Sequence, residues 1–345
     1  SARPVTTESI VTDVLTWVGL RSATDDAPAP VTPVSGLVES LWLAVRQSQY
    51  TWNNQRPIAG VTMSGPGPDG VVGGHVNAVD YDDAALTYVL ASGPSHGRVV
   101  IDALGSPALA ERLVAEIKKI TPQKITHVVL THYHADHVYG LQVFEKLGAR
   151  IIAHQAGREY LYADTARLRL EQSRKDLAPW IDEQTHLAAA TEWIAARREL
   201  TVGDTRLVIQ PVGPAHTPED LAVYLPDKKV LYAGDLVFRS RIPFVGQADS
   251  RNWIKSLDKL LAFEAAVVVP GHGPASTEAR KDMQLTRDYL AYLRKTMGQA
   301  AKDMTPFDEA YKATDWSQFE HLPLFAAANR MNAYNTYLLM EHEPE

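Results

Sequence analysis

Short apolar segments alternate with amphipathic segments along the middle of the chain. Residues 107–120 predict a helix, because Ser106 is a good N-cap, Pro107 suits the first helical position, and apolar residues recur at helical spacing after them. Strands that alternate with helices in this way predict an α/β fold. Apolar runs of strand length occur at residues 86–90, 98–101, 125–131, 150–154, 206–210, 221–225, 230–233 and 265–269.

The same pattern divides the chain into three regions. Residues 1–74 are heterogeneous and include a Pro-rich stretch, so we expect an N-terminal extension packed on the core. Residues 75–275 carry the alternating strands and helices and form the predicted main domain. Within it, residues 155–200 have helical periodicity and predict a helical insertion. Residues 276–345 predict a C-terminal helical region.

The composition is that of a globular protein. The 345 residues are 45% hydrophobic and 22% charged, which supplies enough apolar material for a large core. No run approaches the ~18 consecutive apolar residues that a membrane span needs, so we expect no span. The net charge is −7 and Lys and Arg are scattered in ones and twos, so nucleic acid is a poor candidate partner.

The chain contains no cysteine. This excludes disulfides, thiolate nucleophiles and Cys-based zinc or iron–sulfur sites, so any metal must be bound by His and carboxylate side chains. The chain begins at Ser1 rather than Met, which fits either a clipped signal peptide or an artificial boundary. On this ground a periplasmic or secreted location is slightly favoured over a cytoplasmic one.

The strongest chemical signal directly follows the predicted strand 125–131. His132, His134, Asp136 and His137 lie in one short loop, at the point where a buried strand ends. Residues of a tight loop can converge on one ion while the strand holds the loop rigid. This density of imidazole and carboxylate groups predicts a metal site.

Three more candidate ligands lie further along the chain. His216, Asp235 and His272 each follow a predicted strand, in segments rich in Gly and Pro. Each is weak evidence alone, since a His beside Gly is more often a turn residue. Together with the first loop they make a set of candidate ligands at strand ends, which is where α/β sheets place their sites.

In order and type these residues resemble the ligand pattern of the metallo-β-lactamase-fold superfamily. Asp102 also resembles that family's early aspartate, although the glycine often found two positions later is displaced to Gly105. The resemblance covers about residues 84–275. It implies an α/β fold of the four-layer αβ/βα sandwich type, with two sheets packed face to face and helices outside. The main domain would then be the catalytic domain, with its site at one edge between the sheets.

The resemblance also implies how metal ions are held. Neutral imidazole and carboxylate ligands suit zinc, and iron or manganese would also fit. Two ions about 3.5–4 Å apart lower the pKa of a shared water and supply hydroxide without a nucleophilic side chain. Asp136 is the candidate catalytic residue, because it could also help to move a proton to the leaving group. The implied ligands are His132, His134 and His216 for one ion, Asp136, His137 and His272 for the other, and Asp235 between them.

Asp235 favours an ester-type hydrolase. In this family the antibiotic-degrading enzymes usually have Cys or Ser at the equivalent position, whereas glyoxalase II-like thioesterases, lactonases and related hydrolases have Asp. We therefore expect cleavage of an ester, thioester or lactone in a small-molecule substrate, similar to the periplasmic zinc metallohydrolases of the family. The alternatives are a β-lactamase, a mononuclear iron enzyme acting on persulfides, a phosphodiesterase, and a binding protein that has kept its metals.

Three residues beside the ligands are candidate substrate contacts. Arg239 and Arg241 could bind an anionic group, and Tyr133 could donate to an oxyanion. Solvated loop residues and simple packing are the alternative explanations. The sequence leaves a homo-oligomer open.

Overall fold

The computed structural model describes residues 58–63, 74–79, 88–90, 97–246 and 248–342. Most of the predicted N-terminal extension, residues 1–74, lies outside these ranges. Its described part is strand β1 (Ile58–Met63), which pairs antiparallel with β2 (Gly74–Val79).

Two five-stranded sheets form the body of the protein. In the first sheet β4 to β7 are parallel and β3 is an antiparallel edge strand. In the second sheet all pairs are antiparallel except β11 with β12. The first sheet consists of β3 (Tyr88–Leu90), β4 (Arg98–Ile101), β5 (Ile125–Val129), β6 (Arg150–His154) and β7 (Glu192–Ile194). The second consists of β8 (Arg198–Val202), β9 (Thr205–Pro211), β10 (Leu221–Leu225), β11 (Val230–Phe238) and β12 (Val267–His272).

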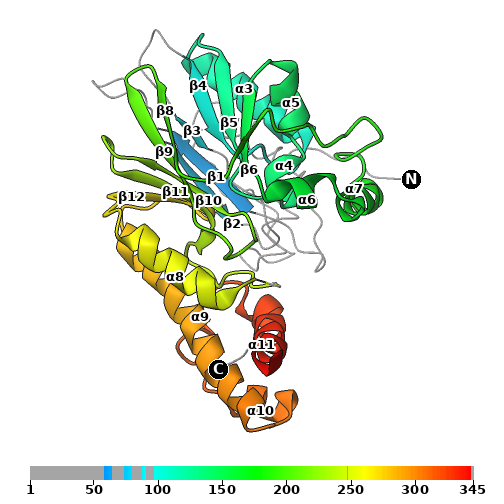
Figure 1. Ribbon diagram of the computed structural model, residues 1–345, viewed down its shortest axis with the longest axis vertical. Helices are drawn as coiled ribbons and strands as arrows, with labels where there is room; N and C mark the ends of the chain where they lie inside the picture. The colour runs from blue at the N-terminus through cyan, green and yellow to red at the C-terminus, as the bar shows by residue number, and fades with distance from the viewer. Residues whose placement is uncertain (1–57, 64–73, 80–87, 91–96, 247, 343–345) are drawn as a thin grey trace, which may run out of the picture.

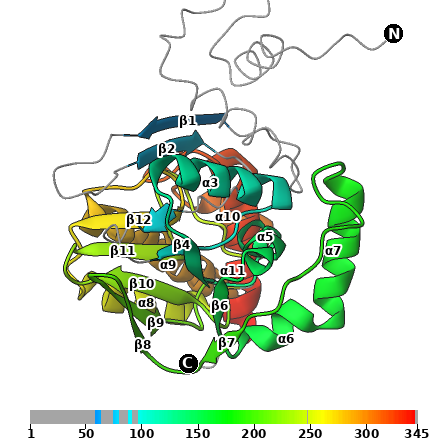
Figure 2. The same cartoon turned by 90° about the horizontal axis from the view of Figure 1, so that it is seen from above.

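Three apolar clusters show that the sheets and helices form four layers. One cluster lies between the sheets and joins Ile101 and Val129 of the first sheet to Leu207 and Val223 of the second. A second cluster packs α3 (Pro107–Ile120) and α5 (Leu141–Lys146) on the outer face of the first sheet. A third packs α8 (Ser250–Leu261) and α9 (Ala279–Lys302) on the outer face of the second sheet (Figures 1 and 2). The predicted αβ/βα sandwich is confirmed.

Helix α3 forms as its sequence predicts. The Ser106 hydroxyl accepts a hydrogen bond from the backbone N–H of Leu109, and Pro107 occupies the first helical position. The helix ends before Thr121, and Lys118 and Lys119 in its last turn complement the helix dipole. The buried side chains of this helix face the first sheet.

The predicted helical insertion at residues 155–200 is only partly correct. Helices α6 (Gly157–Tyr162) and α7 (Asp164–Asp176) occupy its first half. Its second half contains β7, which extends the first sheet, and β8, which is the edge of the second. The physical reason is that β7 pairs with β6 and β8 pairs with β9, so pairing with neighbouring strands overrides a weak helical pattern.

The C-terminal region is helical, as the sequence predicts. Helices α9, α10 (Phe307–Ala313) and α11 (Phe325–His342) extend away from the sandwich (Figure 1). A buried polar network joins them: the Tyr289 hydroxyl donates to Asn329 Oδ1 at 2.8 Å and accepts from Asn332 Nδ2 at 3.0 Å. Buried amides with satisfied hydrogen bonds fix the relative position of α9 and α11.

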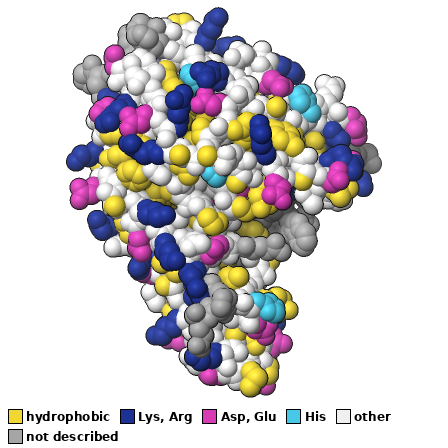
Figure 3. All heavy atoms as spheres, in the orientation of Figure 1, with side chains coloured by type: hydrophobic (Ala, Val, Ile, Leu, Met, Phe, Trp, Pro, Cys, Tyr) yellow, Lys and Arg dark blue, Asp and Glu magenta, His cyan; other side chains and the backbone are white. Residues whose placement is uncertain are grey.

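The surface carries mixed charges. On the face shown in Figure 3, Lys and Arg side chains are interspersed with Asp and Glu and form no single basic patch. Among the described helices, none is both long enough and apolar enough to cross a membrane.

Candidate metal centre

The loop after β5 and the short helix α4 (Ala135–Val138) bring the first candidate ligands together. The backbone N–H of His137 donates to the carbonyl of His134 at 3.0 Å, which closes the first turn of this helix. The turn directs His132, His134, Asp136 and His137 to one place at the edge of the two sheets. All four predicted residues of this loop therefore converge.

His216 completes a first group of candidate ligands. His134 Nδ1 lies 3.0 Å from His132 Nε2 and 3.1 Å from His216 Nε2. Asp235 Oδ2 lies 3.4 Å from His216 Nε2. Ligand atoms of these four side chains all lie within 4.8 Å of one another, which is the spacing expected around one ion.

Asp136, His137 and His272 form a second group. Asp136 Oδ2 lies 3.2 Å from His137 Nε2 and 3.6 Å from His272 Nε2. Asp235 joins the two groups, since its Oδ1 lies 3.2 Å from His137 Nε2 and its Oδ2 lies 3.1 Å from His272 Nε2. The grouping is the one that the resemblance implies, with Asp235 in the middle.

The donor set fits a cation. Asp136 Oδ2, His137 Nε2 and Asp235 Oδ1 are buried atoms without a hydrogen-bond partner, and they point at the same place. Burying a carboxylate oxygen without a partner is costly, and a positive ion removes that cost. His and Asp are also the ligand types that divalent zinc, iron and manganese accept. The residues present therefore fit a bound metal ion.

Asp102 orients the imidazole of His137. The Asp102 carboxylate accepts hydrogen bonds from the Thr131 backbone N–H at 2.7 Å and from its hydroxyl at 2.8 Å. It also lies 2.9 Å from His137 Nδ1, which we assign as a donor, leaving the Nε2 lone pair for a metal. The Thr131 oxygen can then accept from His132 Nδ1 at 3.0 Å, which frees His132 Nε2 in the same way.

Two glycines allow the close approach of the strands at the site. A Cβ atom on Gly271 would lie 1.9 Å from Asp235 Oδ1, so no side chain is possible there. Gly234 has φ +53°, and a Cβ atom there would lie 2.8 Å from the Thr131 side chain. Asp235 was predicted to follow the end of its strand, but β11 continues to Phe238. The register shift beside Gly234 turns Asp235 into the site within the strand.

Burial and neighbouring carboxylates together determine the charge of the candidate ligands. It lowers the pKa of His134 to about 3 and that of His216 to about 4, so both are neutral and able to bind metal near pH 7. Burial alone would lower the pKa of His137, but the carboxylates of Asp136, Asp235 and Asp102 raise it well above its usual value. The second group therefore attracts a positive charge, which bound metal would supply.

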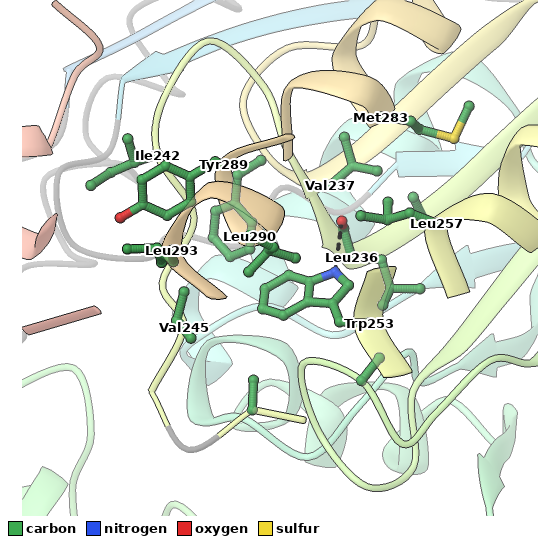
Figure 4. Packing of buried hydrophobic residues seen from close by; sticks show 14 of the residues in the cluster. Leu236, Val237, Ile242, Val245, Trp253, Leu257, Met283, Tyr289, Leu290 and Leu293 are labelled. Atoms are coloured by element: carbon green, nitrogen blue, oxygen red, sulfur yellow. Dashed lines mark hydrogen bonds between the residues drawn. The ribbon is translucent and has the colours of Figure 1, made fainter. Parts of the chain in front are cut away.

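Aromatic rings pack against two of the candidate ligands, His216 and His272. The Trp253 ring lies 5.1 Å from that of His216, and Phe238 stacks on His272 at 4.9 Å with a 10° angle between the planes. Trp253 is fully buried, with its indole N–H donating to the Leu236 carbonyl at 3.1 Å (Figure 4). These rings pack against two of the candidate ligands from the apolar core.

Two buried carboxylates near the ligands were not singled out from the sequence. Glu219 Oε1 accepts from the backbone N–H of Tyr133, between two candidate ligands, at 2.9 Å. Asp220 accepts from the Thr217 N–H at 2.7 Å and its hydroxyl at 2.9 Å, which fixes the turn that carries His216. Burial raises the pKa of Glu219 to about 7. The sequence signal that could have pointed to them is two adjacent acidic residues directly before the apolar strand β10.

The three predicted substrate contacts have different surroundings. Arg239 forms an ion pair with Asp282 at 3.4 Å and donates to the Ala275 carbonyl at 3.3 Å, and its role in substrate binding stays a prediction. Arg241 is buried, with its guanidinium 5.5 Å from the centre of the Phe238 ring. Tyr133 is half-buried with its ring 4.8 Å from that of His134, and its role in substrate binding stays a prediction.

Comparison with known proteins agrees with this geometry. The model of the metallo-beta-lactamase superfamily matches residues 80–272, more than half of the chain. The chain belongs to this superfamily. It is 26% identical over 246 residues to the linear primary-alkylsulfatase of Pseudomonas sp., a match that covers 61% of this chain and 46% of the relative. It is 28% identical over 184 residues to the metallo-beta-lactamase type 2 of Bacillus sp., covering 52% of this chain and 63% of that enzyme.

A solved structure extends the likeness to most of the chain. The inverting sec-alkylsulfatase from Pseudomonas sp. superposes with a TM-score of 0.63 and covers 95% of this chain and 54% of its own, at 20% identity. At this identity the match shows a shared fold. The chain spans about half to two thirds of the length of the relatives it matches.

Proposed function

We propose that this protein is a dinuclear metal-dependent hydrolase, with zinc as the preferred metal, that cleaves an ester, thioester or lactone bond in a small molecule. The observation that carries the proposal is the position of Asp235, with one carboxylate oxygen 3.2 Å from His137 Nε2 and the other 3.4 Å from His216 Nε2. One carboxylate thus faces both ligand groups. The hydrolytic relatives support the reaction class.

The ligand groups, Asp102 and Asp136 have different roles in the proposed reaction. Divalent ions held by the two groups would lower the pKa of a water molecule and polarise the bond to be cleaved. Asp102 keeps His137 in the tautomer that presents Nε2 to the site. Asp136 is the more exposed of the two acidic ligands, at 19% against 4% for Asp235. Its carboxylate could therefore accept a proton from the attacking water and pass it to the leaving group.

Alkyl sulfate esters are a second candidate substrate class. The match to the linear primary-alkylsulfatase extends over 246 residues, further than the 184 residues matched to the β-lactamase. A β-lactamase is the weaker candidate also because Asp235 stands where that branch usually has Cys or Ser. The mixed charge of the face in Figure 3 gives no support to a nucleic-acid substrate.

The test is a substrate panel on protein stripped of metal and reloaded separately with zinc, iron or manganese. The panel contains a phenyl ester, a γ-lactone, a thioester, an alkyl sulfate, nitrocefin and a phosphodiester. We expect zinc-dependent turnover of one or more of the first three. Replacing His216 by Ala should abolish it, whereas the control His186→Ala changes an exposed histidine paired with Glu145 and should leave it intact. One bound iron per chain with consumption of a persulfide, or no turnover of the phenyl ester, the γ-lactone and the thioester alike, refutes the proposal.

A further inference from the structure

Glu219 is a buried acidic residue to which the proposed reaction gives no role. Only 3% of its surface is exposed, and its Oε1 accepts a hydrogen bond from the backbone N–H of Tyr133 at 2.9 Å. Tyr133 is the single residue between His132 and His134, two candidate ligands of the same group. Glu219 therefore contacts the ligand loop at a backbone N–H that lies between two ligands.

This hydrogen bond completes a pattern that begins with Asp102. The Asp102 carboxylate accepts from the backbone N–H of Thr131 at 2.7 Å, and Glu219 accepts from the N–H two residues later. His132 lies between these two points. Its backbone is thus attached on one side to the residue that follows β4, in the first sheet, and on the other to the turn before β10, in the second. A ligand whose backbone is fixed on both sides is oriented before a metal binds.

The two histidines of this loop present different ring nitrogens to the site. His132 Nε2 lies 3.0 Å from His134 Nδ1, and the same Nδ1 lies 3.1 Å from His216 Nε2. Because Nδ1 is closer to the backbone than Nε2, the backbone of His134 must lie nearer to the site than that of His132. The peptide at Tyr133 makes this step. A displacement of Tyr133 would therefore separate the ligand atoms, and a metal site tolerates only about 0.5 Å of such misplacement.

Helices α6 and α7 hold the ring of the same tyrosine. The Tyr160 ring of α6 stacks on the Tyr133 ring at 4.9 Å with a 16° angle between the planes. The Arg169 guanidinium of α7 lies 4.9 Å from the centre of the Tyr133 ring, and it also donates to the Tyr160 carbonyl at 3.3 Å. The segment after β6 thus restrains the ring of Tyr133, while Glu219 restrains its backbone.

The carboxylate of Glu219 fits tightly and lowers stability. A Cβ atom on Gly157, at the start of α6, would lie 3.3 Å from Glu219 Cγ, so this side chain has little freedom. Its second oxygen, Oε2, is buried without a hydrogen-bond partner among the residues that the structure describes. The nearby Thr217 hydroxyl donates to Asp220 Oδ1 at 2.9 Å instead. A buried polar atom without a partner is destabilising, and such exceptions are expected where a residue serves function.

We propose that Glu219 is a positioning residue: its hydrogen bond with Tyr133 places the imidazoles of the first ligand group for their metal ion. The inference rests on the metal centre of the proposed function and adds to it a residue outside the ligand set. A charged and a neutral carboxyl can both accept the Tyr133 N–H, so the inference does not depend on the charge of Glu219. The second ligand group should be affected little, because Asp102 orients His137.

The test measures binding of cobalt(II) to the full chain, by competition against a chelator and by visible absorption. The ion of the first group is identified by its loss in His216→Ala. Glu219→Leu, which has a similar volume and no acceptor, should weaken this ion about 10- to 100-fold and change its absorption bands, while the second ion is bound as in the wild type. Glu219→Gln keeps an acceptor oxygen and should restore both. The control Val114→Ala truncates a buried side chain of α3 and should lower stability without changing either ion.

Each outcome supports or overturns the inference. Wild-type affinity and absorption in Glu219→Leu, equal weakening of both ions, or binding in Glu219→Gln as weak as in Glu219→Leu overturns it and leaves the proposed function standing. If Glu219→Leu does not fold, Glu219→Asp decides, because its carboxylate is one methylene shorter and cannot reach the Tyr133 N–H. The first ion should then be at least about tenfold weaker, and unchanged binding refutes the inference. A wild type that binds no ion overturns the proposed function and this inference together.

Discussion

Replacing Asp102 by Asn tests whether a carboxylate outside the ligand set controls metal binding. Asp102 accepts three hydrogen bonds, at 2.7 and 2.8 Å from Thr131 and at 2.9 Å from His137 Nδ1. An Asn can keep the bond to the Thr131 N–H through its single carbonyl oxygen. Its NH₂ group then faces His137 Nδ1, which must become an acceptor, and the proton moves to Nε2. Asn tolerates the positive φ of 61° at this position, so the backbone should persist.

The expected effect is a loss of metal affinity without loss of the fold. Changes to a partner that orients a ligand usually weaken metal binding about 10- to 100-fold, or about 1.4–2.7 kcal/mol. The assay is competition against a chelator of known affinity, which resolves the two ions separately. The matched control is Asp282→Asn, which changes another buried carboxylate, paired with Arg239, and should leave metal affinity unchanged. Wild-type affinity for both ions in Asp102→Asn would refute the reasoning.

Three further predictions follow from the same structure. Asp136→Ala should reduce turnover by at least about 100-fold with an unchanged circular dichroism spectrum, and full activity would contradict its role. Trp253→Ala removes a fully buried ring and should lower the free energy of unfolding by about 3–5 kcal/mol, measured with urea, whereas a loss under about 1 kcal/mol would contradict its core position. Burial raises the pKa of Glu219 from 4.5 to about 7, so the metal-free protein should lose stability as the pH rises through this range. Glu219→Gln, which does not titrate, should therefore be more stable than the wild type near pH 8, by up to about 3 kcal/mol, and show no such gain near pH 5. An equal difference in the free energy of unfolding between variant and wild type at both pH values would contradict the raised pKa of Glu219.

The candidate metal site was predictable because several of its residues have a local signal. His132, His134, Asp136 and His137 follow one strand directly, and a strand end with several imidazoles has few purely structural explanations. The pairing of His216 and His272 with this loop could be anticipated because strand ends meet at one edge of the sheets. Their grouping around Asp235 came from the family resemblance, and the distances agree with it.

The parts that were missed depend on contacts between distant segments. Glu219 follows a turn and reads as a surface acid, but Gly157 and Leu161 of α6 line the same small cavity and help to bury it. Strand β7 is only three residues long, and pairing with β6 is what makes it a strand. Neither the residues that bury Glu219 nor the strand that pairs with β7 lies close by in the sequence.

The central claim is that the two groups of side chains hold a pair of metal ions joined by Asp235. Anomalous X-ray diffraction from crystals of the zinc-loaded protein, recorded on both sides of the zinc absorption edge, tests it most directly. We predict two peaks per chain about 3.5–4 Å apart. One peak should lie among His132, His134 and His216 and the other among Asp136, His137 and His272, with Asp235 in contact with both. No peak at these side chains, or a single peak that Asp235 does not touch, would contradict the account.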